Sequence, residues 1–161
     1  EPRVMLFTGH SELTIDAKMR LQIPAKYRNA WDEARDGKAW YCVPWPGGIV
    51  RLYSETCFEG LASQGAGGRR ATLTPDQDAA DLEADLFSLA ERIEPDSAGR
   101  IALPKQHLEL AGLGAGGSEV VVIGAGNRLE VRDRAAWQQT LAQRFARLPS
   151  LVAKIEARRE G

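Results

Sequence analysis

The chain has 161 residues, which suits one domain or two small ones, and its 43% hydrophobic residues are enough for a core. Its 27% charged residues are typical of water-soluble proteins, and no apolar run approaches the roughly 20 residues that span a membrane. The net charge of −1 lacks the basic excess of a dedicated nucleic-acid domain, so DNA binding would need a local patch, multiplied by assembly.

The start of the chain, EPRVMLFTGH, lacks the basic-then-apolar pattern of an export signal, so a cytoplasmic location is expected. Cys42 and Cys57 have no Cys or His at metal-ligand spacing, and we expect reduced, partly buried thiols. His10 and His107 have no such neighbours either, and both rings are expected to be partly exposed. Neither a metal nor a cofactor is therefore expected.

A short motif occurs twice, as TIDAKMRLQIP at Thr14–Pro24 and as EPDSAGRIALP at Glu94–Pro104. Five positions carry like chemistry at the same interval of 80 residues (96 − 16, 104 − 24), which is hard to attribute to chance. These pairs are Asp16 and Asp96, Arg20 and Arg100, Leu21 and Ile101, Ile23 and Leu103, and Pro24 and Pro104.

The residues after each motif predict the same elements. A short helix follows each proline, because proline suits the first helical turn, and Gly112 would end the second helix. An apolar strand, a Gly-rich turn and an alternating strand follow, and Ser54 and Asp133 then stand where a helix N-cap belongs. Each half is thus predicted as strand, turn, strand, short helix, two strands and helix, and two such units would share one core about a pseudo-twofold axis.

A flexible loop, SQGAGGRRATL, and a helix are predicted between the halves. Thr74 can cap this helix, Pro75 suits its first turn, and Gln77 completes a capping box. Its apolar stripe, expected to lie in the core or against a helix, is Leu82, Leu86, Leu89 and Ile93. The last segment repeats that stripe, and Pro149 to Gly161 can form one more helix. The second stripe is Trp137, Leu141, Phe145 and Leu148.

Other motifs give no site. The glycines of GLGAGG match G-x-G-x-x-G, but a predicted helix precedes them and a strand follows, which is the reverse of a dinucleotide site. No serine stands in a nucleophile elbow and no acidic pair lies in an apolar pocket that we can infer, so no enzyme is expected. Trp31, Trp40 and Trp45 could stack on bases, but we expect core or subunit contacts.

The two repeated loops, Asp16–Arg20 and Asp96–Arg100, are predicted to be tight turns between strands. The aspartate can accept hydrogen bonds from backbone N–H groups two or three residues on. The arginine begins the next strand, from where it can bind a phosphate or reach a guanine edge. The alternative is an Asp–Arg salt bridge that only closes the turn, and the residue chemistry by itself leaves both open.

From about Leu6 to Gln143 the sequence resembles the MraZ family of bacterial transcriptional regulators, which are built from two AbrB/SpoVT-like halves. The family's paired signature, Asp-x-Lys-Gly-Arg and then apolar-x-apolar-Pro, appears as DAKMRLQIP and DSAGRIALP. The resemblance implies an α+β fold of duplicated swapped-hairpin β-barrel halves about a pseudo-twofold axis, with flanking helices. The implied divisions are 6–64 for the first half, 65–94 for linker and connecting helix, 95–145 for the second half, and 146–161 for a helical tail.

The resemblance also implies a function. A ring-shaped homo-oligomer, an octamer or dodecamer, would bind short direct repeats in promoter DNA of the division and cell-wall gene cluster, mainly as a repressor associated with the nucleoid. Carried over by position, the expected DNA contacts are Lys18, Arg20 and Arg100, and the turn-shaping residues are Asp16, Asp96 and Gly99. No cofactor and no membrane are implied.

The sequence departs from the family at Met19, where the family has glycine, and at Arg132, where it often has tryptophan. If the first turn needs φ > 0, Met19 costs on the order of 1 kcal/mol or the loop changes shape. The alternative function is therefore a ring-forming assembly or protein-interaction module that has lost promoter reading. An antitoxin is disfavoured, because those proteins usually carry one half.

Overall fold

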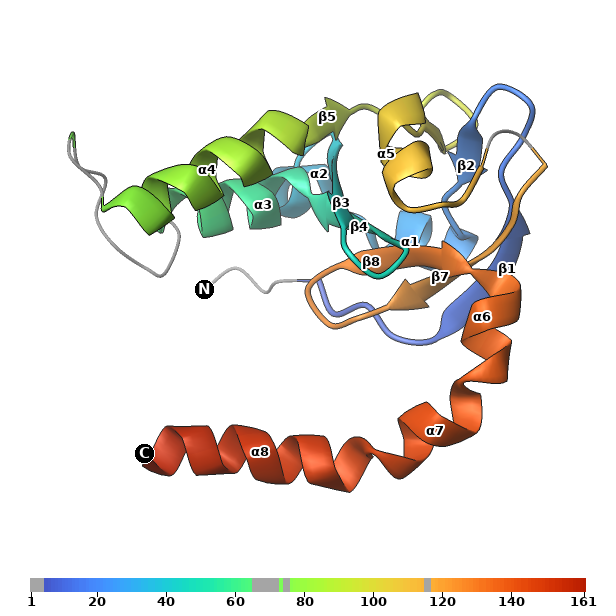
Figure 1. The fold of residues 1–161 in the computed structure, drawn as a ribbon. Coiled ribbons are helices and arrows are strands. Elements are labelled where there is room, and N and C mark those ends of the chain that lie inside the picture. Colours follow the sequence, from blue (N-terminus) through green and yellow to red (C-terminus); the bar gives the residue numbers. More distant parts are fainter. Residues whose placement is uncertain (1–4, 65–72, 74–75, 115–116) are drawn as a thin grey trace.

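The computed structural model describes residues 5–64, 73, 76–114 and 117–161 as a mixed α+β fold (Figure 1). The strands are β1 (His10–Thr14), β2 (Arg20–Gln22), β3 (Trp40–Trp45), β4 (Ile49–Ser54), β5 (Glu91–Ile93), β6 (Arg100–Ala102), β7 (Glu119–Gly124) and β8 (Leu129–Asp133). The helices are α1 (Ala25–Ala30), α2 (Glu33–Asp36), α3 (Glu55–Ser63), α4 (Gln77–Leu89), α5 (Lys105–Leu110), α6 (Arg134–Gln139), α7 (Leu141–Ala146) and α8 (Leu148–Glu160).

The predicted order of elements is confirmed in both halves, with α2 as an addition in the first. Ser54 and Asp133 cap their helices as predicted, accepting hydrogen bonds from the backbone N–H groups of Cys57 and Ala136. Gly112 follows the end of α5 with φ +65°, the left-handed conformation that ends many helices.

The strands of the two halves pair with each other in antiparallel fashion. One sheet has the order β1-β7-β8-β4-β3-β5, and β2 and β6 form a separate two-stranded ribbon. Leu13 of β1 lies opposite Val120 of β7, and 80 residues away the equivalent Ile93 of β5 lies opposite Trp40 of β3. The first strand of each half therefore pairs with the third strand of the other half in the same register.

Two further pairings join equivalent residues of the two halves. Leu21 lies opposite Ile101 in the β2–β6 ribbon, and Arg51 lies opposite Glu130 between β4 and β8. Arg51 and Glu130 correspond at an interval of 79 (130 − 51), because one residue has been lost from the second hairpin. This register is what a pseudo-twofold relation between the halves requires, whereas closed barrels stay a prediction.

The core lies between the sheet and the β2–β6 ribbon, with α1 and α5 packed at its sides. Leu21 and Ile101 are fully buried at its centre. The Phe7 ring lies 5.5 Å from that of Tyr27 and 5.8 Å from that of Trp40. Of the tryptophans that could have stacked on bases, Trp40 is therefore a core residue.

His107 is buried, which corrects the prediction of a partly exposed ring, whereas His10 is exposed. It lies on the inner side of α5 beside Leu108, and its Nδ1 is 3.1 Å from Sγ of the buried Cys42. Burial lowers the pKa of His107 and raises the pKa of the Cys42 thiol, because both charged forms lose water contact. The pair is thus a neutral imidazole beside a thiol inside the core.

The buried imidazole predicts an acid-sensitive stability. Because the pKa of His107 is lower in the folded than in the unfolded chain, the unfolded state binds more protons as pH falls through the ordinary value of 6.5. Urea unfolding at a series of pH values from about 7.5 to 5 should show the free energy of unfolding falling in this range for the parent and less steeply for His107→Gln. His10→Gln, which removes an exposed imidazole in place of a buried one, is the control. Equal slopes in all three proteins would contradict the assignment.

The connecting helix ends earlier than predicted. α4 stops at Leu89, and Ile93 lies in β5 instead, where the strand pairs with β3 and Ile93 packs against the core. Strand pairing therefore overrides the helical spacing. Asp76 caps α4 by accepting from the Ala79 N–H, whereas the predicted cap residues Thr74 and Pro75 lie outside the described residues. Most of the predicted SQGAGGRRATL loop lies outside them as well.

The chain ends in α6, α7 and α8. α6 packs on β7 and β8, and α8 confirms the predicted tail helix (Figure 1). None of the helices in the described part of the chain is both long and apolar enough to cross a membrane.

Candidate nucleic-acid interface

The first repeated loop is held together by the Asp16 carboxylate. Its Oδ1 accepts hydrogen bonds from the backbone N–H groups of Lys18 (2.9 Å) and Arg20 (2.8 Å), and its Oδ2 accepts from Nε of Arg20 (2.8 Å). The backbone bond from Arg20 is the largest cause that lowers the pKa of Asp16. The carboxylate therefore stays charged and fixes both the turn and the arginine.

The second loop repeats this arrangement. Oδ1 of Asp96 accepts from the N–H groups of Ala98 (3.0 Å) and Arg100 (2.9 Å), and Oδ2 accepts from Nε of Arg100 (2.9 Å). The pKa of Asp96 is lowered too, first by the backbone bond from Arg100. The two loops thus present their arginines in the same way.

Met19 adopts the left-handed conformation that its glycine counterpart adopts. Its φ is +61°, and that of Gly99 is +80°. The Met19 side chain is half-buried against the core, which offsets part of the backbone strain. Each of the two carbonyls accepts a hydrogen bond from the other half, from Leu103 N to Met19 O and from Ile23 N to Gly99 O. The first loop therefore keeps the shape of the second.

The strain at Met19 can be measured by comparing two truncations. Met19→Gly and Met19→Ala lose the same thioether packing, but only glycine adopts φ > 0 without cost. We expect Met19→Gly to exceed Met19→Ala in free energy of unfolding by about 1 kcal/mol, measured by urea denaturation. At Gly99 the substitution to alanine should cost about 1–2 kcal/mol. A Met19→Ala protein as stable as Met19→Gly would show that this loop is not strained.

The β2–β6 ribbon brings both arginines onto one face. Gln22 lies opposite Arg100, and Arg20 lies opposite Ala102, so the two arginines are diagonal neighbours. Diagonal positions of an antiparallel pair lie roughly 7–8 Å apart. Because side chains alternate along a strand, the arginines point outward while the residues between them face the core. Two residues 80 positions apart in the sequence therefore share one exposed surface.

The arginine–aspartate salt bridges leave the ends of both guanidinium groups available. Arg20 keeps 29% and Arg100 keeps 34% of its side chain exposed, and only Nε of each is used. Within the described part of the chain, their terminal nitrogens make no hydrogen bond. Closing the turn and contacting a ligand are therefore compatible roles. Lys18 lies exposed in the first loop.

Two residues of this surface were missed by the sequence analysis. Nε2 of Gln22 donates to the Ala98 carbonyl (2.9 Å), which ties β2 to the second loop. Nε of Arg28 donates to the Ile23 carbonyl (2.9 Å), and its side chain lies against Gly99. Because side chains alternate along a strand, Gln22 could have been predicted to share the face of Arg20. No sequence pattern marks Arg28, because only the packing of α1 places it beside the other half's loop.

The residues of this surface, Lys18, Arg20, Gln22, Arg28 and Arg100, are called the ribbon face below. Its chemistry is that of hydrogen-bond donors and positive charges around two fixed turns. No group of three His, Cys, Asp or Glu side chains suited to a metal occurs among the residues that the structure describes.

Comparison with known proteins places the chain in a family. A family model described as "MraZ protein, putative antitoxin-like" matches residues 86–158. A transcriptional regulator MraZ of Nitrosococcus oceani is 32% identical over 157 residues, which is 96% of each chain. The chain belongs to the MraZ family.

Other relatives agree with the family assignment. The MraZ regulator of Kocuria rhizophila is 34% identical over 146 residues, covering 88% of this chain and 90% of the relative. The MraZ regulator of Methylobacillus flagellatus is 30% identical over 138 residues, covering 86% and 88%. The predicted resemblance is therefore confirmed, and membership in the MraZ family places the chain among transcriptional regulators and not among enzymes.

Proposed function

We propose that this chain is a sequence-specific DNA-binding regulator, mainly a repressor, of the division and cell-wall gene cluster. The observation that carries the proposal is the ribbon face, where Arg20 and Arg100 point outward side by side and are each held by an aspartate. Held guanidinium groups lose little conformational freedom on binding and can make paired hydrogen bonds to phosphate or to guanine O6 and N7.

The shape of the ribbon supports the same proposal. The major groove of B-DNA, about 12 Å wide, admits a two-stranded β-ribbon. The two loops lie at opposite ends of β2–β6, so Lys18 in the first loop and Arg28 of α1, beside the second loop, would then contact the flanking phosphates. The positive φ of Met19 supports a functional first loop, because the turn that the family's glycine would form is kept. The alternative of a pure assembly module rested on methionine at position 19 in place of the family's glycine, and it is weaker because the turn is kept.

Assembly would resolve the low net charge. A chain of net charge −1 offers only a few cations on its ribbon face. A ring of such chains on short direct repeats would place several ribbon faces along one duplex, and each neutralised phosphate adds to the salt dependence of binding.

The two-half organisation is part of the proposal. We infer swapped-hairpin barrel halves at 6–64 and 95–145, joined by 65–94 and followed by the tail at 146–161. The support is the equal register of β1 on β7 and of β5 on β3, in which each half supplies its first strand to the other.

Fluorescence anisotropy tests the function with DNA from upstream of the gene that encodes this chain and with a shuffled duplex of equal composition. The native duplex should bind at least about 1,000-fold more tightly than the shuffled one, with an affinity that falls steeply as salt rises. Equal, weak binding to both duplexes would overturn promoter reading and favour the assembly module.

A further inference from the structure

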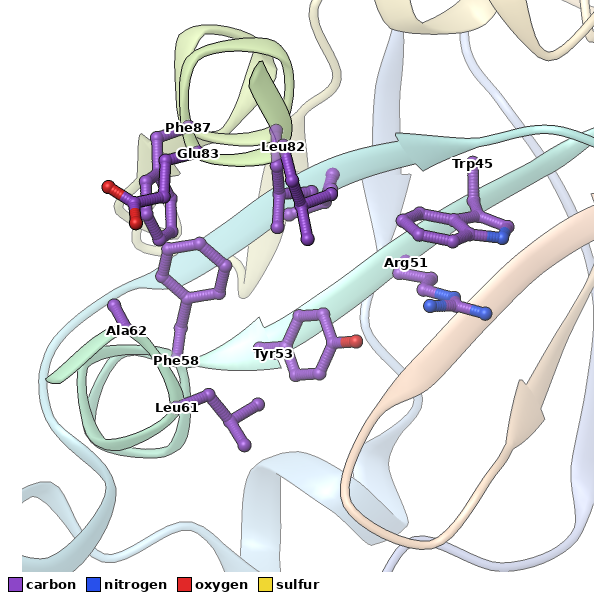
Figure 2. Close-up of a pocket in the computed structure, with 11 residues that line it drawn as sticks. Trp45, Arg51, Tyr53, Phe58, Leu61, Ala62, Leu82, Glu83 and Phe87 are labelled. Carbon is purple, nitrogen blue, oxygen red and sulfur yellow. The ribbon is translucent and has the colours of Figure 1, made fainter. Parts of the chain in front are cut away.

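An apolar groove lies between α3, α4 and the β3–β4 hairpin (Figure 2). Phe58 and Leu61 line it from α3, Leu82 and Phe87 line it from α4, and Tyr53 lines it from β4. Trp45 closes one end, with the Arg51 guanidinium 4.3 Å from the centre of its ring. Several of these large side chains are exposed although they gather at one place: Leu82 45%, Leu61 42%, Phe87 39% and Trp45 38%. Of the predicted α4 stripe, Leu82 and Leu86 line the groove, and Leu86 also packs against the buried cluster that contains Phe58.

The helices beside this groove are acidic. α3 and α4 contain no lysine or arginine. Their acidic residues, of which Glu55 is already paired with Arg92, are Glu55, Glu59, Asp78, Asp81, Glu83 and Asp85. Of these acids Glu83 lines the groove itself, where Arg51 lies on the strand side. An apolar groove between two helices of net negative charge is suited to an apolar helix that carries positive charge.

The end of the same chain has these properties. Apolar side chains recur at intervals of four, three, four and three residues along α7 and α8, which puts them on one stripe. This seam consists of Leu141 (60% exposed), Phe145 (75%), Leu148 (54%), Val152 (54%) and Ile155 (49%). Figure 1 shows α8 apart from α3 and α4 of its own chain, so the seam does not fill its own groove.

The charge of the tail is opposite to that of the groove. Between residues 141 and 161 there are five cationic side chains and two acidic ones, a balance of +3 (5 − 2). The cations are Arg144, Arg147, Lys154, Arg158 and Arg159, and the acids are Glu156 and Glu160. Two tails packed against each other would bring these positive charges together and leave both grooves open. A tail in a groove pairs opposite charges and covers both apolar surfaces.

We propose that the seam of α7–α8 of one copy docks in the apolar groove between the acidic helices α3 and α4 and strand β4 of the next copy. The two contact surfaces differ, so a pair of copies still has one free groove and one free seam, and such head-to-tail contacts form a ring when the rotation between successive copies closes. The seam–groove contact would be the interface between neighbouring copies of the proposed ring oligomer. The inference therefore rests on the ring assembly in the proposed function and not on DNA binding.

Complementation between two variants tests the contact. The seam variant carries Phe145→Asp and Val152→Asp, and the groove variant carries Leu61→Asp and Leu82→Asp. All four positions are more than 40% exposed in the single chain, so both variants should fold, which circular dichroism checks. Sedimentation velocity then gives the mass of each variant alone, of their equal mixture, and of the parent protein.

The parent should form an assembly larger than a dimer, and each variant alone should be a monomer. The mixture should form dimers and nothing larger, because only the seam of the groove variant and the groove of the seam variant remain intact. A groove variant that assembles like the parent, a mixture that stays monomeric, or a monomeric parent whose tail binds anionic vesicles would each overturn the proposal. Loss of promoter binding with an intact complementation result would instead overturn DNA reading alone.

Discussion

Replacing Arg20 and Arg100 together by glutamine is expected to weaken binding to the promoter duplex by about 100-fold or more, because each paired contact to a base or phosphate is worth about 1–3 kcal/mol. Glutamine keeps a polar side chain of similar reach but has no charge and no second donor arm. Anisotropy titrations at several salt concentrations measure the change. The slope of log affinity against log salt should also become shallower, because fewer phosphates are neutralised.

The matched control removes a similarly held arginine elsewhere. Arg92→Gln deletes an arginine of β5 that is also partly exposed and also held by carboxylates, those of Glu55 and Glu94, and it should leave the affinity within a few-fold of the parent. Stability is a second control, because partly exposed ion pairs such as Arg20–Asp16 contribute little to the free energy of unfolding. A folded Arg20/Arg100 variant with parental affinity would show that the ribbon face does not contact DNA.

Gly124→Ala should lower the free energy of unfolding by about 3 kcal/mol, at the upper end of the usual cost of overpacking. A Cβ at this position would lie 2.4 Å from the backbone nitrogen of Thr8 and 2.5 Å from the carbonyl carbon of Phe7. These atoms cannot move aside easily, since hydrogen bonds from Phe7 N to Gly126 O and from Gly124 N to Gly9 O hold both segments. Urea denaturation measures the difference.

Gly60→Ala is the matched control, because it makes the same change where there is room. Gly60 lies inside α3, and nothing lies within 4 Å of the position of an added Cβ. Its free energy of unfolding should rise by about 0.4–1 kcal/mol, since alanine restricts the unfolded chain and suits a helix. If both variants changed stability equally, close backbone packing at Gly124 would not be what excludes a side chain there.

The internal repeat made the order of elements predictable, because equal spacing of Asp, Arg and Pro in two places gives each half as a check on the other. The tertiary contacts of individual residues were harder to predict from the sequence. The helical spacing of Leu82 to Ile93 was real, but β3 offers Ile93 a strand partner that no local pattern reveals. His107 was misjudged for a related reason, since only the packing of α5 shows that its ring meets Cys42.

The conformation of the two loops of the candidate site was predictable from the sequence, but the way in which the fold brings them together was not. The spacing of Asp16 and Arg20 already indicated a closed turn with a projecting arginine. That Arg20 and Arg100 come onto the same face follows from the pairing of β2 with β6, which the sequence of either motif alone does not contain. Arg28 joined the surface through the tertiary fold, because it reaches across from one half to the other.

The pairing of Arg51 with Glu130 has a consequence for which halves can pair with each other. At this crossing an identical pair of halves would place each residue against its own copy, yet here a cation meets an anion, 3.5 Å apart. A first half that exchanged partners with another first half would set arginine against arginine, and two second halves would set glutamate against glutamate. In the proposed ring, where many equivalent strands would lie close together, the mismatch would make such strand exchange between chains unfavourable. The fused halves have thereby become complementary and no longer interchangeable.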